Sequence, residues 1–269
     1  MAAGLQGMRT TPRPLLRGPR IPTGLGAEVI DVDSYLGALT QAAGARGYPV
    51  EVLGKVEGLP LLYLPGPSTG RRVLVAGGFH GDEPAGPLAI LAWLLSGLEV
   101  PGVSVSFLPL ANPTGFRDNT RYTVHGEQTN QGWIWPGPGE TLSWEGQQLL
   151  HHVGRLVLAA RDGFLTLHED WEPAGYYFYA CDDVDGPTGP LVARFRQVGD
   201  QWFRPFDGIY RREGVRVRNG LVWEGGTGSF EDLLHEVGIP RVITSETPSG
   251  EDLWRRAACQ FEWIRAFLG

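Results

Sequence analysis

The stretch VLVAGGFHGDEPAG, residues 73–86, ends an apolar run at a histidine and then places Gly-Asp-Glu-Pro where a helix should begin. The apolar run predicts a buried strand, and residues 83–96 predict a helix that tolerates a proline in its first turn. His80 and Glu83 lie in the turn between these two elements. Because such a turn brings residues three apart to the same side, the imidazole and the carboxylate can point at one place.

Glycines at positions 77, 78 and 81 surround this histidine. Glycine permits close approach of backbone segments and unusual dihedral angles, so the turn is expected to pack tightly around His80. The pair also has a simpler interpretation, because a carboxylate such as that of Glu83 stabilises a helix start through the helix dipole.

Outward from this stretch, the chain alternates segments typical of strands and of helices. The predicted strands are two around a glycine turn in residues 50–66, then 71–79, 103–112, 163–170, 176–180 and 241–247. The predicted helices are 29–47, 83–96, 141–161 with an N-cap at Thr141 or Ser143, 191–198, 229–238 and 251–269. Strands separated by helices predict an α/β fold whose mixed, mostly parallel central sheet is flanked by helices on both faces.

Length and composition limit the class of protein. The 269 residues, 42% of them hydrophobic, indicate a single globular domain over residues 25–269 after a loose N-terminal tail over residues 1–24. The net charge of −7 disfavours nucleic-acid binding. No stretch approaches the ~20 apolar residues of a membrane span, and the tail lacks the apolar core of a signal peptide. Two cysteines form no disulfide framework, so a cytoplasmic location is predicted.

Polar residues at the carboxyl ends of the predicted strands are the candidates for a site, because ligands of such sheets bind there. His80 and Glu83 follow one strand, His168 closes GFLTL, and Glu246 closes RVITS. Two histidines and a glutamate are a donor set of catalytic zinc sites, where the metal lowers the pKa of water toward ~7 and polarises a carbonyl. Glu246 is then expected to act as a general base. Each residue alone has a structural alternative, such as a core histidine or a helix-capping glutamate.

Five segments together carry a family resemblance: GGFHGDEPAG, ANPTGF, DNTRY, LTLHED and ITSETP. Over about residues 71–250 the chain resembles the zinc carboxypeptidase family, including its succinylglutamate desuccinylase and aspartoacylase branch, in the order and approximate spacing of these segments. The resemblance implies one zinc ion per chain, held by His80, Glu83 and His168.

The same resemblance implies two catalytic residues. Glu246 matches the catalytic base of the family, and Arg121 matches the arginine that polarises the substrate carbonyl and holds the oxyanion. The implied substrate is a peptide or an N-acyl amino acid.

One segment, QTNQGW, departs from the family pattern Asp-Leu-Asn-Arg. Asn130 is kept, whereas Gln128 and Gln131 replace the aspartate and the arginine. The arginine of the family binds a substrate carboxylate, and a neutral Gln131 cannot supply that charge-assisted contact. The aspartate orients a metal-ligating histidine, and Glu127 is its possible substitute here. Arg117 offers another cation for the carboxylate.

Aromatic and basic residues near this segment are further candidates. Trp133, Trp135 and Trp171 could line a substrate pocket, although core packing is the alternative, and Trp133 is placed with Asn130, Gln131 and Arg117 as substrate-binding. The basic stretch YRREGVRVR, residues 210–218, either binds a carboxylate or forms an exposed strand.

These patterns predict a zinc-dependent hydrolase that cleaves an amide bond, most simply a metallocarboxypeptidase acting on peptides. An N-acyl amino acid deacylase and a non-catalytic zinc-site binding protein on the same scaffold are the alternatives. A dinucleotide-binding enzyme would need G-x-G-x-x-G after the first parallel strand, which GGFHGDEPAG does not provide. A serine hydrolase would need G-x-S-x-G at a strand-to-helix turn, and no predicted turn of that kind carries it. The oligomeric state is left open.

Overall fold

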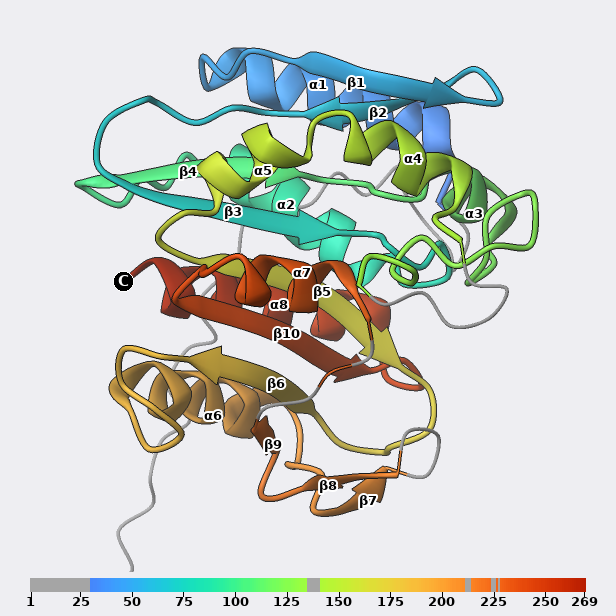
Figure 1. The fold of residues 1–269 in the computed structure, drawn as a ribbon. Coiled ribbons are helices and arrows are strands. Elements are labelled where there is room, and N and C mark those ends of the chain that lie inside the picture. The colour runs from blue at the N-terminus through green and yellow to red at the C-terminus, as the bar shows by residue number, and fades with distance from the viewer. Residues whose placement is uncertain (1–29, 135–140, 211–213, 224–225, 227) are drawn as a thin grey trace, which may run out of the picture.

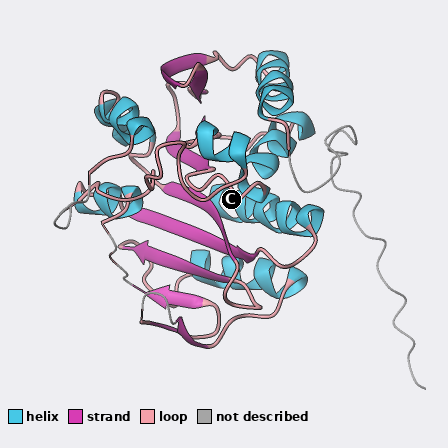
Figure 2. Ribbon diagram, turned by 90° about the vertical axis from the view of Figure 1, so that its right-hand side faces the viewer, coloured by secondary structure: helices cyan, strands magenta, loops and turns pink. Residues whose placement is uncertain are grey.

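The computed structural model describes residues 30–134, 141–210, 214–223, 226 and 228–269. The predicted tail over residues 1–24 therefore lies outside the described residues. Figure 1 shows a central sheet with helices in front of it and behind it, and Figure 2 shows the same layers from the side. This is the predicted α/β architecture.

The strands and helices follow the predicted order for most of the chain. The strands are β1 Glu51–Val56, β2 Leu59–Tyr63, β3 Arg71–Gly77, β4 Val103–Leu108, β5 Phe164–Asp170, β6 Tyr177–Asp182, β7 Gly208–Tyr210, β8 Val215–Val217, β9 Leu221–Trp223 and β10 Arg241–Pro248. The helices are α1 Val32–Ala45, α2 Ala85–Ser96, α3 Pro113–Asp118, α4 Trp144–Leu150, α5 Val153–Ala159, α6 Pro190–Trp202, α7 Phe230–Glu236 and α8 Leu253–Leu268.

Six strands form the central sheet in the order β4-β3-β5-β10-β6-β9. All neighbours are parallel except β10 and β6, so the sheet is mixed and mostly parallel. Because β3, β5 and β10 are adjacent and parallel, their carboxyl ends meet at one edge. The register places Glu246 of β10 directly beside His168 of β5.

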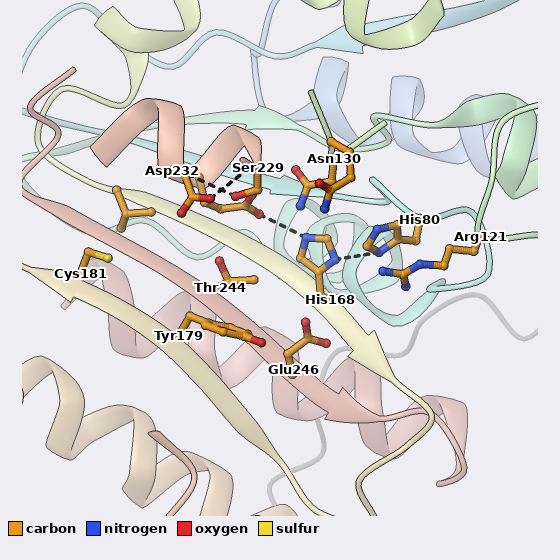
Figure 3. A pocket seen from close by; sticks show the side chains of 13 residues that line it. His80, Arg121, Asn130, His168, Tyr179, Cys181, Ser229, Asp232, Thr244 and Glu246 are labelled. Atoms are coloured by element: carbon orange, nitrogen blue, oxygen red, sulfur yellow. Dashed lines mark hydrogen bonds and ion pairs between the residues drawn. The ribbon is translucent and has the colours of Figure 1, made fainter. Parts of the chain in front are cut away.

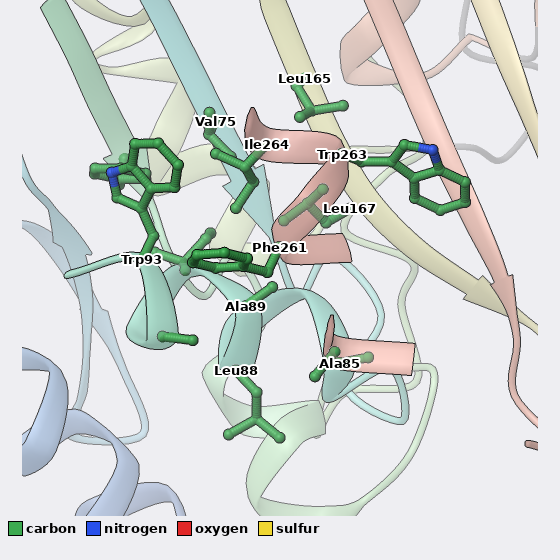
Figure 4. Close-up of a cluster of buried hydrophobic side chains, with 14 of the residues drawn as sticks. Val75, Ala85, Leu88, Ala89, Trp93, Leu165, Leu167, Phe261, Trp263 and Ile264 are labelled. Atoms are coloured by element: carbon green, nitrogen blue, oxygen red, sulfur yellow. The ribbon is translucent and has the colours of Figure 1, made fainter. Parts of the chain in front are cut away.

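Alternate residues of the strands enter two separate cores, because successive side chains of a strand point to opposite faces. On one face, Val75, Leu165 and Leu167 pack in a cluster that includes side chains of α2, α6 and α8 (Figure 4). On the other face, Leu74 and Phe164 pack in a cluster with side chains of α4, α5 and α7. The second face carries the site described below.

The segment predicted as one helix over residues 141–161 forms two helices, α4 and α5. Ser143 is the N-cap of α4, as one alternative predicted, and its hydroxyl accepts a hydrogen bond from the Gly146 amide at 3.0 Å. The helical pattern breaks at His152, whose backbone has φ −114° and ψ 7°. The His152 ring donates a hydrogen bond to the Leu53 carbonyl oxygen of β1 at 2.8 Å. A contact with a distant strand therefore accompanies the break.

Two short strands and one short helix have no predicted counterpart, namely β7, β9 and α3. In the basic stretch over residues 210–218, β8 exposes Arg216, which pairs with Asp207 at 3.2 Å, and buries Val217. The exposed-strand interpretation is therefore correct for these described residues. Within the described part of the chain, none of the helices combines the length and apolarity needed to cross a membrane.

The turn after β3 requires glycine at two positions. Gly78 has φ +64°, in the left-handed region that favours glycine. A Cβ atom added to Gly81 would lie 1.9 Å from the Gly115 carbonyl carbon, so the turn packs directly against the backbone of α3. The predicted close approach around His80 is thus present.

This contact predicts the effect of a single methyl group. Gly81→Ala should lower the free energy of unfolding by about 1–3 kcal/mol or more, because backbone must move to accommodate the Cβ atom. Gly37→Ala is the matched control, since Gly37 lies in the interior of α1 and its added Cβ would meet nothing within 4 Å. That control should raise stability by about 0.5–1 kcal/mol through helix propensity. Urea denaturation measures both, and equal stabilities for the two variants would contradict the packing argument.

Candidate metal centre

His80, Glu83 and His168 converge on one buried point. Both histidines direct Nδ1 at the Glu83 carboxylate, His80 at 2.7 Å from Oε1 and His168 at 2.8 Å from Oε2. The two Nδ1 atoms lie 3.2 Å apart. The three side chains are at most 5% exposed as residues, and their donor atoms all lie within 4.8 Å of one another. The structure therefore brings together the three residues predicted as metal ligands.

The start of α2 holds Glu83 in place. No side chain of the turn caps this helix; instead the Ala85 amide donates to the Glu169 carboxylate of β5 at 2.6 Å. The other oxygen of Glu169 forms an ion pair with Arg256 of α8. Because Glu169 follows His168 directly, the strand that carries one histidine also anchors the helix that follows Glu83. The two halves of the site are therefore positioned together.

The electrostatics of these residues fit a divalent cation. Burial lowers the pKa of His80 to about 4, so this imidazole is neutral and has a lone pair available at neutral pH. Burial alone would raise the pKa of Glu83, but His80 and His168 more than offset it, so the pKa is lowered and the group is a carboxylate. Two imidazole nitrogens and a carboxylate oxygen that face one another are the donor set of catalytic zinc sites.

His168 is the proton-binding member of the group. Burial lowers its pKa, but the Glu83 and Glu231 carboxylates, together with the charge of Glu246, raise it well above its usual range. A metal ion held by His168 Nδ1 would compete with a proton for this nitrogen, because metal ligands must be deprotonated.

Glu231, at the start of α7, contacts the other ring nitrogen of His168. Its Oε1 lies 3.3 Å from His168 Nε2 and accepts a hydrogen bond from the Thr166 hydroxyl at 2.6 Å. A carboxylate in this position fixes the orientation and tautomer of a ligating histidine. Glu127, considered as the substitute for the missing aspartate, instead accepts hydrogen bonds from the Trp144 amide at 3.0 Å and the Thr123 hydroxyl at 3.4 Å. It therefore does not take that role.

The two residues predicted as catalytic lie beside the group. Arg121 Nη1 lies 3.1 Å from Glu83 Oε1. Glu246 lies next to His168 in the sheet, and its Oε2 is buried with no hydrogen-bond partner among the described residues. Burial, with the nearby Glu83 and Asp170 carboxylates, raises the pKa of Glu246 well above its usual range. The arrangement thus offers a guanidinium and a carboxylate on the same cavity as the histidines (Figure 3).

The cavity lies over the sheet beneath the start of α7. Its lining includes two of the predicted substrate-binding residues, Asn130 and Gln131. Sequence reasoning missed the remaining lining residues, which are Tyr179, Cys181, Ser229, Glu231, Asp232, Val242 and Thr244. Strand alternation gave a usable signal for two of them, because Val242 and Thr244 share the face of Glu246 at a period of two.

Arg117 and Trp133, also predicted to bind substrate, lie elsewhere among the described residues. Arg117 pairs with the neighbouring Asp118 at 2.7 Å on the exposed surface of α3 and does not line the cavity. Trp133 is a core residue, since its ring packs 4.7 Å from that of Phe230 and its indole donates to the Thr129 carbonyl oxygen. Arg117 pairs with its neighbour in the sequence, whereas Trp133 packs on a residue distant in the chain, which is the core-packing alternative.

Of the other two tryptophans, the structure describes only Trp171. Trp171 is 73% exposed and is absent from the lining. Trp135 lies outside the described residues.

Three solved structures are similar to this chain, two of them in both sequence and fold and one in fold alone. A candidate metallopeptidase from Shewanella denitrificans OS217 is 31% identical, with a TM-score of 0.80 over 88% of this chain and 89% of that one. A second, from Shewanella amazonensis SB2B, is 31% identical, with a TM-score of 0.81 over 88% of this chain and 92% of that one. A metallo-carboxypeptidase from Burkholderia cenocepacia, 18% identical, is similar in fold alone, with a TM-score of 0.61 over 87% of this chain and 66% of that one. No family model and no curated protein matches the sequence.

The converging donor atoms predict stoichiometric metal binding. The protein should retain one zinc ion per chain after dialysis, and His168→Ala should lose it, because a nitrogen donor facing Glu83 is removed. His151→Ala, at an exposed histidine after α4, is the matched control and should retain the metal. Elemental analysis of the dialysed proteins measures the content, and full retention in His168→Ala would refute the assignment.

Proposed function

Because the chain belongs to the zinc carboxypeptidase-like family of metallopeptidases, we propose that it is a zinc-dependent hydrolase of an amide bond, with His80, Glu83 and His168 as ligands. The observation that carries this proposal is the convergence of these three buried residues beside Glu246 on one cavity. A zinc ion bound there would supply a Lewis acid for the substrate carbonyl and lower the pKa of water.

Glu246 is the proposed general base and acid. Its carboxylate accepts a proton from the attacking water and delivers it to the leaving amine. Its place in β10 beside His168 supports this role, and it is not one of the three residues whose donor atoms converge. The buried oxygen without a hydrogen-bond partner supports this role, because such an oxygen is available to a water or an amine.

Arg121 is the proposed oxyanion donor. Its guanidinium lines the cavity, and the contact of Nη1 with Glu83 Oε1 holds one end of this guanidinium in place. The remaining N–H groups can donate to a carbonyl oxygen as negative charge develops on it, which stabilises the transition state more than the substrate.

A metallocarboxypeptidase acting on peptides is the first candidate within this class. Gln131 keeps the N-acyl amino acid deacylase as a second candidate, since this neutral amide lines the cavity where the family has an arginine for the terminal carboxylate. A non-catalytic binding protein is the third possibility, and measurable turnover separates it from the other two.

Replacement of the proposed base tests the mechanism. Glu246→Gln should retain zinc and lose about 10²–10⁴-fold in kcat on any substrate that the wild type cleaves, because proton transfer is removed and the ligands are untouched. Hydrolysis of a panel of blocked dipeptides and N-acyl amino acids, with metal analysis in parallel, provides the measurement. Glu236→Gln, at the exposed end of α7, is the control. Wild-type rates in Glu246→Gln would mean that another group is the base.

Replacement of Gln131 tests selectivity for a terminal carboxylate. The wild type should show a weak preference for a free C-terminus over the C-terminal amide in kcat/KM. Gln131→Arg should increase that preference about 10- to 100-fold, because a charge-assisted contact of about 1.5–3 kcal/mol is restored. Arg117→Ala should leave the preference unchanged, since Arg117 lies outside the cavity. A strong wild-type preference that collapses in Arg117→Ala would show that Arg117 reaches the carboxylate.

A further inference from the structure

A buried glutamine lies behind the site, on the opposite face of the sheet. Gln260 belongs to α8 and is fully buried. The cluster between α8 and the sheet is apolar, with Leu165, Leu167 and Ile264 among its members (Figure 4). An amide in such a place costs free energy unless its N–H and carbonyl groups are paired. The contacts of Gln260 therefore need a reason other than filling space.

Each polar group of this amide has a partner on β5 or β10. Nε2 donates to the His168 carbonyl oxygen at 2.6 Å and to the Thr247 hydroxyl oxygen at 3.3 Å. Oε1 accepts from the Ser245 hydroxyl at 2.7 Å. The Ser245 hydroxyl also lies 3.1 Å from the Thr166 carbonyl oxygen of β5. One side chain of α8 thus joins the strand that carries a proposed metal ligand to the strand that carries the proposed base.

The points of attachment are the backbone of one functional residue and both neighbours of the other. Ser245 and Thr247 flank Glu246 in β10. Because successive side chains of a strand alternate between faces, these two reach α8 whereas Glu246 reaches the cavity. Glu246 and His168 are direct partners in the register of β10 and β5. Gln260 therefore makes its contacts at the level of the sheet where the proposed base and the proposed ligand lie side by side.

The sheet gives His168 less support than it gives the residues before it. β5 pairs with β3 as far as Leu167, opposite Gly77, and with β10 on its other side as far as Asp170. From His168 onward, β5 therefore has one neighbouring strand in place of two. The hydrogen bond from Gln260 supplies a further contact at the first residue beyond the pairing with β3.

A fully paired buried network favours a single arrangement of its members, because any shift leaves a buried donor or acceptor unpaired. We propose that Gln260 is a positioning residue, which holds His168 and Glu246 in a fixed relation to each other from the far side of the sheet. Gln260 itself does not line the cavity, so it acts through these two residues. The inference rests on the proposed function, since it concerns how the residues of that reaction are placed.

Gln260→Met tests the inference, because it keeps the length of the side chain and removes all of its hydrogen bonds. The zinc dissociation constant, measured by competition with a chromogenic chelator, should rise about 10- to 100-fold, the range expected when a group that supports a metal ligand is lost. On any substrate that the wild type cleaves, kcat should fall by a similar factor. KM should stay nearly unchanged, because the cavity lining is untouched.

Trp263→Phe is the matched control. It removes another buried hydrogen bond of α8, the one from the indole to the Phe195 carbonyl oxygen of α6 at 2.9 Å. Both variants should unfold at a lower urea concentration than the wild type. Trp263→Phe should nevertheless keep wild-type zinc affinity and kcat, which separates a general loosening of α8 from a loss of positioning.

Ser245→Ala is a smaller change, and it remains informative where Gln260→Met does not fold. It leaves the contact between Gln260 and the His168 carbonyl oxygen in place. The zinc dissociation constant should therefore keep its wild-type value, whereas kcat should fall about 2- to 10-fold, the equivalent of one neutral hydrogen bond.

The outcomes separate this inference from the proposed function. Wild-type zinc affinity and kcat in folded Gln260→Met, or wild-type kcat in Ser245→Ala, would overturn the inference and leave the proposed function standing. Equal losses of zinc affinity in Trp263→Phe and Gln260→Met would also overturn it, because loosened packing would then be the cause. A wild type that binds zinc and hydrolyses no substrate would refute the proposed function, and a zinc affinity that still depends on Gln260 would sustain the placement of His168.

Discussion

The buried carboxylate of Glu83 is the contact on which the candidate site depends. One oxygen meets His80 and Arg121, and the other meets His168, so three segments that are distant in sequence are joined at one group. A buried charge is tolerated only when it is paired and hydrogen-bonded, and Glu83 has a partner on each oxygen. The same convergence creates the place for a cation, because the facing nitrogens and carboxylate are all metal donors.

The parallel strands make this convergence possible, and α7 completes it. Neighbouring parallel strands β3, β5 and β10 deliver their carboxyl ends to one edge, so His168 and Glu246 are adjacent by register alone. The first turn of α7 then places the Glu231 carboxylate next to Nε2 of His168. In this chain the carboxylate that contacts His168 Nε2 comes from a helix, whereas Gln128 stands where the family pattern has an aspartate. Polar support for His168 thus comes from α7, whose Glu231 also lines the cavity.

Local pattern predicted most of the fold and the central residues of the site. Apolar runs marked the strands that carry His168 and Glu246, and the glycines around His80 marked a tight turn that the structure contains. Local pattern failed where a distant partner decided the outcome. The helical periodicity through His152 gave no sign of the break between α4 and α5. For Trp133 the sequence left pocket lining and core packing open, and the contact with Phe230 decided for the core.

The sequence by itself determined the order of strands and helices, the fold class, and the four strand-end residues His80, Glu83, His168 and Glu246. It could do so because periodicity, turn chemistry and motif spacing are properties of residues close together in the chain. Only the tertiary structure decided that Glu231 faces His168 and lines the cavity. The physical reason is that contacts between distant segments set the sheet register and the helix packing. These in turn determine which side chains share a buried space.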